Sequence, residues 1–318
     1  MHTANHYYGH AHVMAQYAGL AEVPRIWGYL QHGWNTVDGY AVGHQFTDGF
    51  TKLVWSEACA RRGWQLGLRD YMVVGAPFAY LLEMERQREW LASSPRREGT
   101  IVYPFHGWEQ QHVLGSHAHY IEELRAVEGD VPITVCLYWN EYRQDHVRKV
   151  YEQAGFRVIT HGYRGFMWKG TDTQFLHKQL AELRRHSRVV SNRISTAIFY
   201  GAATGADVGI YGDPMLLEAE RAQLGGPAKP LRLWPELHTP HIPRNLAAQQ
   251  ARLELGTDEL LSPAEIRQAF GWQHALRSER GEGLETSPTG DSLSEDSSAP
   301  PATLPTDDQA AQLEETTA

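Results

Sequence analysis

The sequence predicts an α/β fold in which two domains with parallel sheets face a cleft, the first domain being the shorter. Three observations support this prediction. Residues 99–213 alternate between β-branched apolar runs and amphipathic segments, and residues 1–85 repeat the same alternation in a shorter form. From Gly281 onward the composition changes, and large apolar residues become few. Strands that alternate with helices of this length are typical of βαβ units and a parallel sheet.

The second domain, residues 96–280, has the clearer alternation. Apolar runs predict strands at 100–105, 132–139, 156–160, 188–191 and 207–211. Residues with helical spacing lie between them, at 120–125, 146–151 and 175–183. Gly155 follows the second of these helices and is a typical stop signal. We therefore expect a Rossmann-like domain in this part of the chain.

The first domain, residues 1–88, is predicted to begin with a helix at about 9–20. The strands expected after it lie at 26–31, 52–56 and 71–74, with a helix at 57–66. The charged segment 83–97 has the character of an exposed connection to the second domain. Near the end of the fold, Ser262, Pro263 and Glu265 form the pattern of a helix N-terminus with a capping box.

Composition limits the possible classes of function. The chain has 318 residues, a formal net charge of -9 and no basic stripe, so duplex nucleic acid is a poor candidate partner. Cys59 and Cys136, its two cysteines, each lie in an apolar run, which fits a reduced cytoplasm and no zinc site. No signal peptide or transmembrane segment is recognisable. Residues 281–318 are acidic and rich in Pro and Ser, and we expect them to form a disordered tail.

Three predicted strands end in the triplet histidine, glycine and an aromatic residue. The histidines are His32, His106 and His161, and Arg164 follows the third triplet closely. Ligands of open parallel sheets bind beyond the carboxyl ends of the strands, where each triplet is expected. Histidine can carry a proton near neutral pH or donate to a phosphate. Any single one of these residues could instead be a buried histidine that caps a strand end.

A further candidate site is the turn from the strand at 188–191 into an apolar helix. Ser195 and Thr196 at the helix start, with Arg193 before them, could hold a nucleotide diphosphate at the positive end of the helix dipole. A plain N-cap would use the same residue types. Glu109 is a plausible carboxylate in the same cleft, and Asp213 could accept from a ligand hydroxyl unless it only forms a turn.

Several other chemistries lack their motifs. Two histidine clusters, around His10 and His117, have no cysteine nearby and no His-Glu-x-x-His pattern, so no metal site is predicted. The sequence has no Gly-x-Ser-x-Gly elbow, which disfavours serine hydrolases. It also has no dinucleotide-binding glycine motif and no Walker loop, which disfavours nicotinamide enzymes and P-loop kinases.

Together these segments resemble glycosyltransferases of the GT-B fold. The resemblance covers about residues 25–275. It depends on the end of the first half at Gly75-Ala76-Pro77, on residues 100–106, on residues 191–197 and on the closing segment 254–272. It is nearest to the bacterial surface-polysaccharide type, such as polysialyltransferase-like and CDP-glycerol glycerophosphotransferase-like enzymes. Compared with these, the first domain is reduced.

The resemblance implies a function and a set of roles. The chain would move a sugar, phosphosugar or polyol phosphate from a nucleotide-activated donor to a cell-surface glycan precursor, with a glycan or lipid-linked glycan as acceptor. No cofactor and no metal are implied. In the catalytic role we expect His32, with His106 and Glu109 as further candidates. The residues expected to bind the donor are His161, Arg164, Arg193, Ser195, Thr196 and Asp213.

Two other functions remain open at this point. A sugar-nucleotide epimerase of the same architecture would need additional carboxylates in the cleft, of which Glu109 and Asp213 are the best candidates. A sugar- or nucleotide-binding protein without catalytic activity would also explain the short first half.

Overall fold

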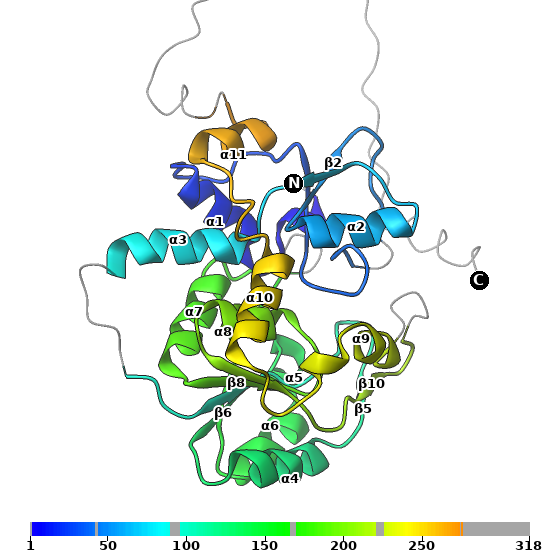
Figure 1. The fold of residues 1–318 in the computed structure, drawn as a ribbon, viewed down its shortest axis with the longest axis vertical. Coiled ribbons are helices and arrows are strands. Elements are labelled where there is room, and N and C mark those ends of the chain that lie inside the picture. Colours follow the sequence, from blue (N-terminus) through cyan, green and yellow to red (C-terminus); the bar gives the residue numbers. More distant parts are fainter. Residues whose placement is uncertain are drawn as a thin grey trace, which may run out of the picture. The chain divides into compact units, whose positions relative to one another are not determined.

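The computed structural model describes residues 2–41, 44–89, 96–165, 170–220, 226–273 and 275. All of them belong to one compact unit, Met1–Arg280. The predicted tail, 281–318, lies outside the described residues. Within this unit the described chain forms a mixed α/β structure with two separate parallel sheets, as the alternation of strands and helices predicts (Figure 1).

The larger sheet has five parallel strands in the order β7-β6-β4-β8-β9. These strands are, in chain order, β4 (Thr100–Val102), β6 (Ile133–Cys136), β7 (Arg157–Ile159), β8 (Arg188–Ser191) and β9 (Asp207–Ile210). The chain starts in the centre at β4, moves outward to β7, and then returns to β8 on the other side of β4. Ile101 of β4 is therefore paired with Thr134 of β6 and with Val189 of β8. The strand order reverses between β4 and β8, as in doubly wound folds.

Helices cover both faces of this sheet, because its apolar residues alternate between the faces with the period of a strand. Val102 and Val190 face a core formed with α4 (His117–Glu128) and α6 (Asp145–Gln153). Ile101 and Val189 face the opposite core, which includes α7 (Phe175–Arg185) and α8 (Thr196–Ala203). Figure 1 shows α4 and α6 on one side of the sheet and α7 and α8 on the other.

The smaller sheet has three parallel strands, β1 (Gly28–Leu30), β2 (Thr51–Val54) and β3 (Tyr71–Val73), in the order β1-β2-β3. The helices of this part of the chain are α1 (His10–Tyr17), α2 (Glu57–Gln65) and α3 (Pro77–Glu89). Ser56 caps α2 by accepting from the Cys59 amide. The expected connection at 83–97 is partly wrong, because α3 continues through Glu89 and residues 90–95 lie outside the described chain.

Several short elements complete the described fold. Helix α5 (Trp139–Arg143) begins at the last residue of the strand predicted at 132–139 and was not predicted as a separate element. The antiparallel pair of β5 (Val113–Leu114) with β10 (Leu216–Leu217) was not predicted either. The strand expected at 100–105 ends at Val102, since Pro104 has no N–H for the sheet. The other elements are η1 (Thr3–Asn5), η2 (Tyr7–Gly9), α9 (Ala228–Leu233), η4 (Pro235–Leu237), α10 (Arg244–Leu255) and α11 (Pro263–Ala269).

The C-terminal elements return to the first part of the chain. Helix α10 contacts both α8 and α2. The indole N–H of Trp272 donates to the Arg25 carbonyl at 3.1 Å, and the Trp27 amide donates to the Phe270 carbonyl at 3.1 Å. The capping box predicted at the start of α11 is present, with Ser262 and Glu265 bonding to each other's backbone. One sheet thus lies within residues 1–88 and the other within 96–280, while the C-terminal segment contacts both parts.

Candidate functional site

A cavity of about 350 Å³ lies beyond the carboxyl ends of β4 and β8. Residues 103–106, directly after β4, form one wall, and residues 193–197, at the start of α8, form another. The loop after β1, including residues 32–35, and part of the N-terminal segment also line the cavity. Residues 136–138 at the end of β6, residues 160–162 after β7 and part of α7 contribute further residues to the described lining. The cavity thus lies where the strand order reverses between β4 and β8, which is where ligands of open α/β sheets bind.

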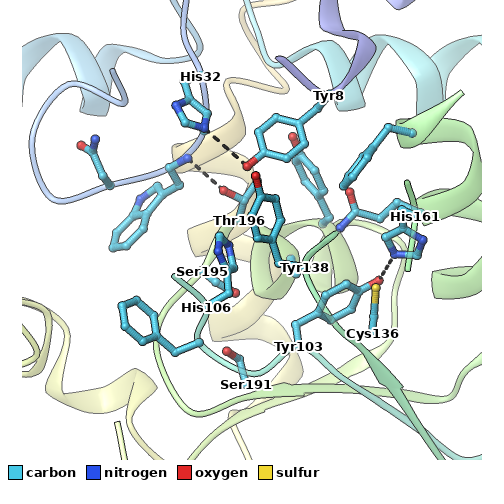
Figure 2. A pocket seen from close by; sticks show the side chains of 18 of the residues that line it. Tyr8, His32, Tyr103, His106, Cys136, Tyr138, His161, Ser191, Ser195 and Thr196 are labelled. Atoms are coloured by element: carbon cyan, nitrogen blue, oxygen red, sulfur yellow. Dashed lines mark hydrogen bonds between the residues drawn. The ribbon is translucent and has the colours of Figure 1, made fainter. Parts of the chain in front are cut away.

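The three histidines of the strand-end triplets all line this cavity. His32 follows β1 of the smaller sheet, His106 follows β4, and His161 follows β7 of the larger sheet. Figure 2 shows the three side chains around the cavity, with Tyr8 beside His32 and Tyr103 beside His161. The sequence repeat therefore indicates a set of side chains that the tertiary fold brings together.

Behind the cavity lining, Arg164 forms a buried hydrogen-bond network. Its Nη2 donates to Glu109 Oε2 at 2.6 Å, and its Nε donates to the Tyr138 hydroxyl at 2.5 Å. Its Nη1 lies 3.3 Å from Nε2 of His32. The Tyr138 hydroxyl in turn donates to Glu109 Oε1 at 3.0 Å. Both carboxylate oxygens of Glu109 are thereby engaged, and neither Glu109 nor Arg164 is part of the cavity lining.

This network determines the tautomer and the charge of the His32 ring. Because a guanidinium can only donate, Nε2 of His32 must accept from Arg164 and its proton must lie on Nδ1. The imidazole also stacks on Tyr7, with ring centroids 4.4 Å apart. Burial, followed by the positive charge of Arg164, holds the pKa of His32 well below its usual range. His32 is thus neutral, and its lone pair is directed at Arg164.

His106 has a different environment. Its Nδ1 lies 2.6 Å from the Gly107 carbonyl, which can only accept, so this nitrogen carries a proton and the lone pair of the neutral ring lies on Nε2. The ring stacks on Tyr138 with centroids 4.5 Å apart, and the residue is exposed. The lone pair of His106 is therefore available to a ligand in the cavity.

His161 is a buried part of the wall. Its Nε2 bonds to the Tyr103 hydroxyl at 2.9 Å, and burial lowers the pKa of the ring to about 3. The imidazole is therefore neutral at physiological pH and shapes the cavity without adding charge.

The start of α8 is open toward the cavity. Ser195 is the N-cap residue, but its side chain makes no capping hydrogen bond, and its buried Oγ has no partner. Thr196 Oγ1 instead accepts from the backbone N–H of Trp34 at 2.9 Å and so ties the loop after β1 to α8. The Ser195 hydroxyl and the positive end of the helix are thus available to an anion.

The two remaining predicted donor-binding residues lie further out. Arg193 lines the cavity and also a neighbouring one of about 440 Å³, and its guanidinium pairs with Glu220 at 2.8 Å. It also lies over the ring of Phe105, 3.7 Å from the ring centroid. Asp213 lines neither cavity, and its Oδ1 accepts from the Met215 amide at 2.9 Å, as in an ordinary turn.

Tyr8, His10 and Tyr200 are among the lining residues that the sequence analysis did not place in the site. Tyr200 lies four residues after Thr196 and thus on the same face of α8, so helical spacing could have found it. Tyr8 and His10 come from the N-terminal segment, and no local pattern connects them with strand ends far along the chain.

No three His, Cys, Asp or Glu side chains of the described chain come together as a metal site would require. Likewise, none of its helices is both long and apolar enough to cross a bilayer.

Comparisons with known proteins give distant structural similarities only. No protein-family model matches the chain, and no curated protein matches it in sequence. A structure of S. aureus MnaA with UDP aligns with TM-score 0.33 at 12% identity, covering 76% of this chain and 62% of that one. A UDP-GlcNAc 2-epimerase from Neisseria meningitidis gives 0.32 at 11% identity, covering 74% and 62%. The wall teichoic acid polymerase TagF gives 0.37 at 11% identity, covering 81% and 69%. The chain thus spans less than two thirds of the length of the first two of these proteins.

Proposed function

We propose that the chain binds a nucleotide-activated donor in the 350 Å³ cavity and transfers a sugar, phosphosugar or polyol phosphate to a glycan acceptor. One observation carries this proposal. The cavity lies where the strand order of the larger sheet reverses, and it is lined by the start of α8, whose N-cap side chain makes no capping hydrogen bond. Phosphates bind at such helix starts because the first N–H groups and the helix dipole both favour an anion.

The charges and donors around the cavity favour a phosphate. The hydroxyl of Ser195 has no protein partner, and the guanidinium of Arg193, which is paired with Glu220, lies in the lining beside the helix start. The described residues that line the cavity include no Asp and no Glu. A diphosphate would therefore meet donors and no lining carboxylate.

The state of each histidine favours His106 as the base that activates the acceptor hydroxyl. Its Nε2 lone pair is available, whereas that of His32 is directed at Arg164. In this proposal the base takes the proton of the acceptor oxygen as that oxygen attacks the transferred group, and the nucleotide departs toward the start of α8. His32, Arg164 and Glu109 then act by holding the loops of the two sheets in place.

The lack of lining carboxylates in the described cavity favours transfer over epimerisation, which needs acid and base groups at the sugar ring. A transferase needs one base at the acceptor, for which His106 suffices.

The test is an incubation of the whole chain with a panel of UDP-, CDP- and GDP-linked donors and glycan acceptors. Wild-type protein should release nucleotide and form a new glycan. His106→Ala should slow transfer by roughly 100-fold or more, the usual contribution of a general base, with unchanged affinity for the nucleotide. His119→Ala, at an exposed histidine of α4, is the matched control and should behave as wild type.

Each other outcome has a definite meaning. An epimerised donor without transfer would identify the chain as an epimerase, and saturable binding without turnover would make it a binding protein. If no member of the panel binds, the proposal is wrong. Full activity of His106→Ala would remove the role assigned to this histidine.

A further inference from the structure

The rings of His10, Trp55 and Tyr200 form a cluster beside the cavity, although Trp55 itself is not part of the described lining. His10 and Tyr200 line the cavity, yet only 1% and 2% of their surfaces are exposed. Nδ1 of His10, Nε1 of Trp55 and the hydroxyl of Tyr200 are buried and have no hydrogen-bond partner. The ring of Trp55 lies 5.9 Å from that of His10 and 6.2 Å from that of Tyr200. Three unpaired polar atoms thus belong to one cluster of rings.

Such a cluster is unusual in the interior of a folded protein. A buried polar group without a partner lowers stability, and most buried polar groups are hydrogen-bonded. Because His10 and Tyr200 line the cavity that we assign to the substrate and Trp55 packs beside both, a ligand group is a natural partner for their unpaired atoms.

The protonation state of each ring defines the ligand chemistry. Burial lowers the pKa of His10 to about 3, and the neutral ring uses its one N–H at the Gln31 backbone. Its unpartnered Nδ1 is therefore an acceptor. Burial raises the pKa of Tyr200 well above its usual range, so its hydroxyl is a neutral donor. The indole N–H of Trp55 is a second donor.

One acceptor and two donors complement a single hydroxyl group, which offers one proton and two lone pairs. The ring of Phe78 stacks on Tyr200 at 3.9 Å between centroids, and Tyr8 lies 5.6 Å from His10, so the surroundings are aromatic. A charged group placed here would be buried against neutral side chains, at a high cost in free energy. A hydroxyl on a carbon ring or chain has the required shape and no charge.

We infer that the cluster of His10, Trp55 and Tyr200 is a subsite for one uncharged hydroxyl of a pyranose or polyol. This inference deepens the proposed function, since the hydroxyl belongs either to the group carried by the donor or to the acceptor. The two sources share the same chemistry, and the following experiment distinguishes them.

The experiment follows the ¹⁵N resonances of the histidines in the whole chain, with His10 assigned by comparison with His10→Gln. Free probes come first: N-acetylglucosamine, methyl glucoside and glycerol. At least one should shift the His10 signals with a saturable curve. Tyr200→Phe should weaken that binding about 3- to 10-fold, the effect of one lost neutral hydrogen bond.

A matched control is available in Tyr120→Phe. The Tyr120 hydroxyl is also buried and unpartnered, but this residue lies in the core beside α6 and lines neither described cavity. The control should change probe binding by less than about twofold, since it removes no group from the cluster of His10, Trp55 and Tyr200. If Tyr200→Phe does not fold, His10→Gln gives the second measurement, with the affinity for the same probe determined by calorimetry.

A second titration compares UDP and CDP with UDP-glucose and CDP-glycerol. A shift of His10 with the linked donors, but not with the nucleotides alone, assigns the hydroxyl to the donor. A shift with free sugar in the presence of saturating nucleotide assigns it to the acceptor.

The outcomes separate the subsite from the proposed function. Nucleotide binding without any response of His10 to a hydroxyl compound would overturn the subsite and leave the proposed function standing. A response to free sugars without nucleotide binding would overturn the proposed function and leave the subsite standing. Equal probe affinities of wild type and Tyr200→Phe would also overturn the subsite.

Discussion

Removal of the Glu254 side chain is expected to destabilise the fold more than an ordinary ion-pair substitution. Glu254 on α10 accepts from Arg62 of α2 through both oxygens, at 2.8 and 2.7 Å, and from the indole N–H of Trp34 at 2.7 Å. Its side chain is 3% exposed and that of Arg62 is 14% exposed. One carboxylate thus joins α2, α10 and the loop that lines the cavity.

The expected loss follows from what Glu254→Ala leaves behind. Breaking a buried ion pair by removing one partner costs about 3–5 kcal/mol, because the other charge stays buried and unpaired. The Trp34 N–H also loses its acceptor, which adds about 1 kcal/mol or more. A total of about 4–6 kcal/mol corresponds to a fall in Tm of about 10–20 °C for a protein of this size.

Thermal and urea unfolding followed by circular dichroism measure this loss. The control is Arg252→Ala on the same helix, whose pair with Asp258 has side chains 65% and 59% exposed and should contribute less than about 1 kcal/mol. Replacement of both buried partners by Arg62→Met with Glu254→Leu should recover much of the loss, since no charge is left unpaired. If Glu254→Ala were as stable as Arg252→Ala, the assignment of a buried link between these elements would be wrong.

Three further predictions concern single groups. Arg164→Lys should lower stability by about 1–3 kcal/mol, because an ammonium cannot replace the forked contacts to Glu109 and Tyr138; an unchanged urea midpoint would refute this. The pKa of His161 is about 3 in the folded chain, against about 6.5 in the unfolded chain. The contribution of the neutral ring to the free energy of unfolding is therefore complete above pH 6.5 and is lost as the pH falls toward 3. His161→Gln should therefore flatten the fall in unfolding free energy between pH 6.5 and 4 by up to about 1.4 kcal/mol per pH unit, and an identical slope in urea titrations would contradict the burial. Ser56→Ala should cost about 1 kcal/mol through the lost cap of α2, and an unaltered Tm would argue against that cap.

Much of the fold could be predicted from the sequence because its information is local. The strands at 188–191 and 207–211 and the capping box at Ser262 depend on neighbouring residues, and the structure confirms them with shifts of one residue at most. The order of the strands depends on the crossovers and is not local. The extent of α3 could not be predicted, because its last turn is charged like an exposed connection.

The candidate site could be predicted only in part, because only some of its features depend on neighbouring residues in the sequence. The repeated triplets indicated His32, His106 and His161, since strand ends converge in any parallel sheet. The state of each histidine depends on partners that are distant in sequence, such as Arg164 for His32. The cluster of His10, Trp55 and Tyr200 could not be predicted, because its three rings come from segments that are far apart in the sequence.

We propose that the cavity at the start of α8 binds the phosphates of a nucleotide. Calorimetric titration of UDP, CDP and GDP onto wild type and Ser195→Ala tests it directly, because the Ser195 hydroxyl is the unpartnered donor at that helix start. We expect saturable binding of at least one nucleotide, and binding about 10- to 100-fold weaker in the folded variant, the range for a lost hydrogen bond to a charged group. Binding of equal affinity to both proteins, or no binding of any nucleotide to wild type, would contradict the claim.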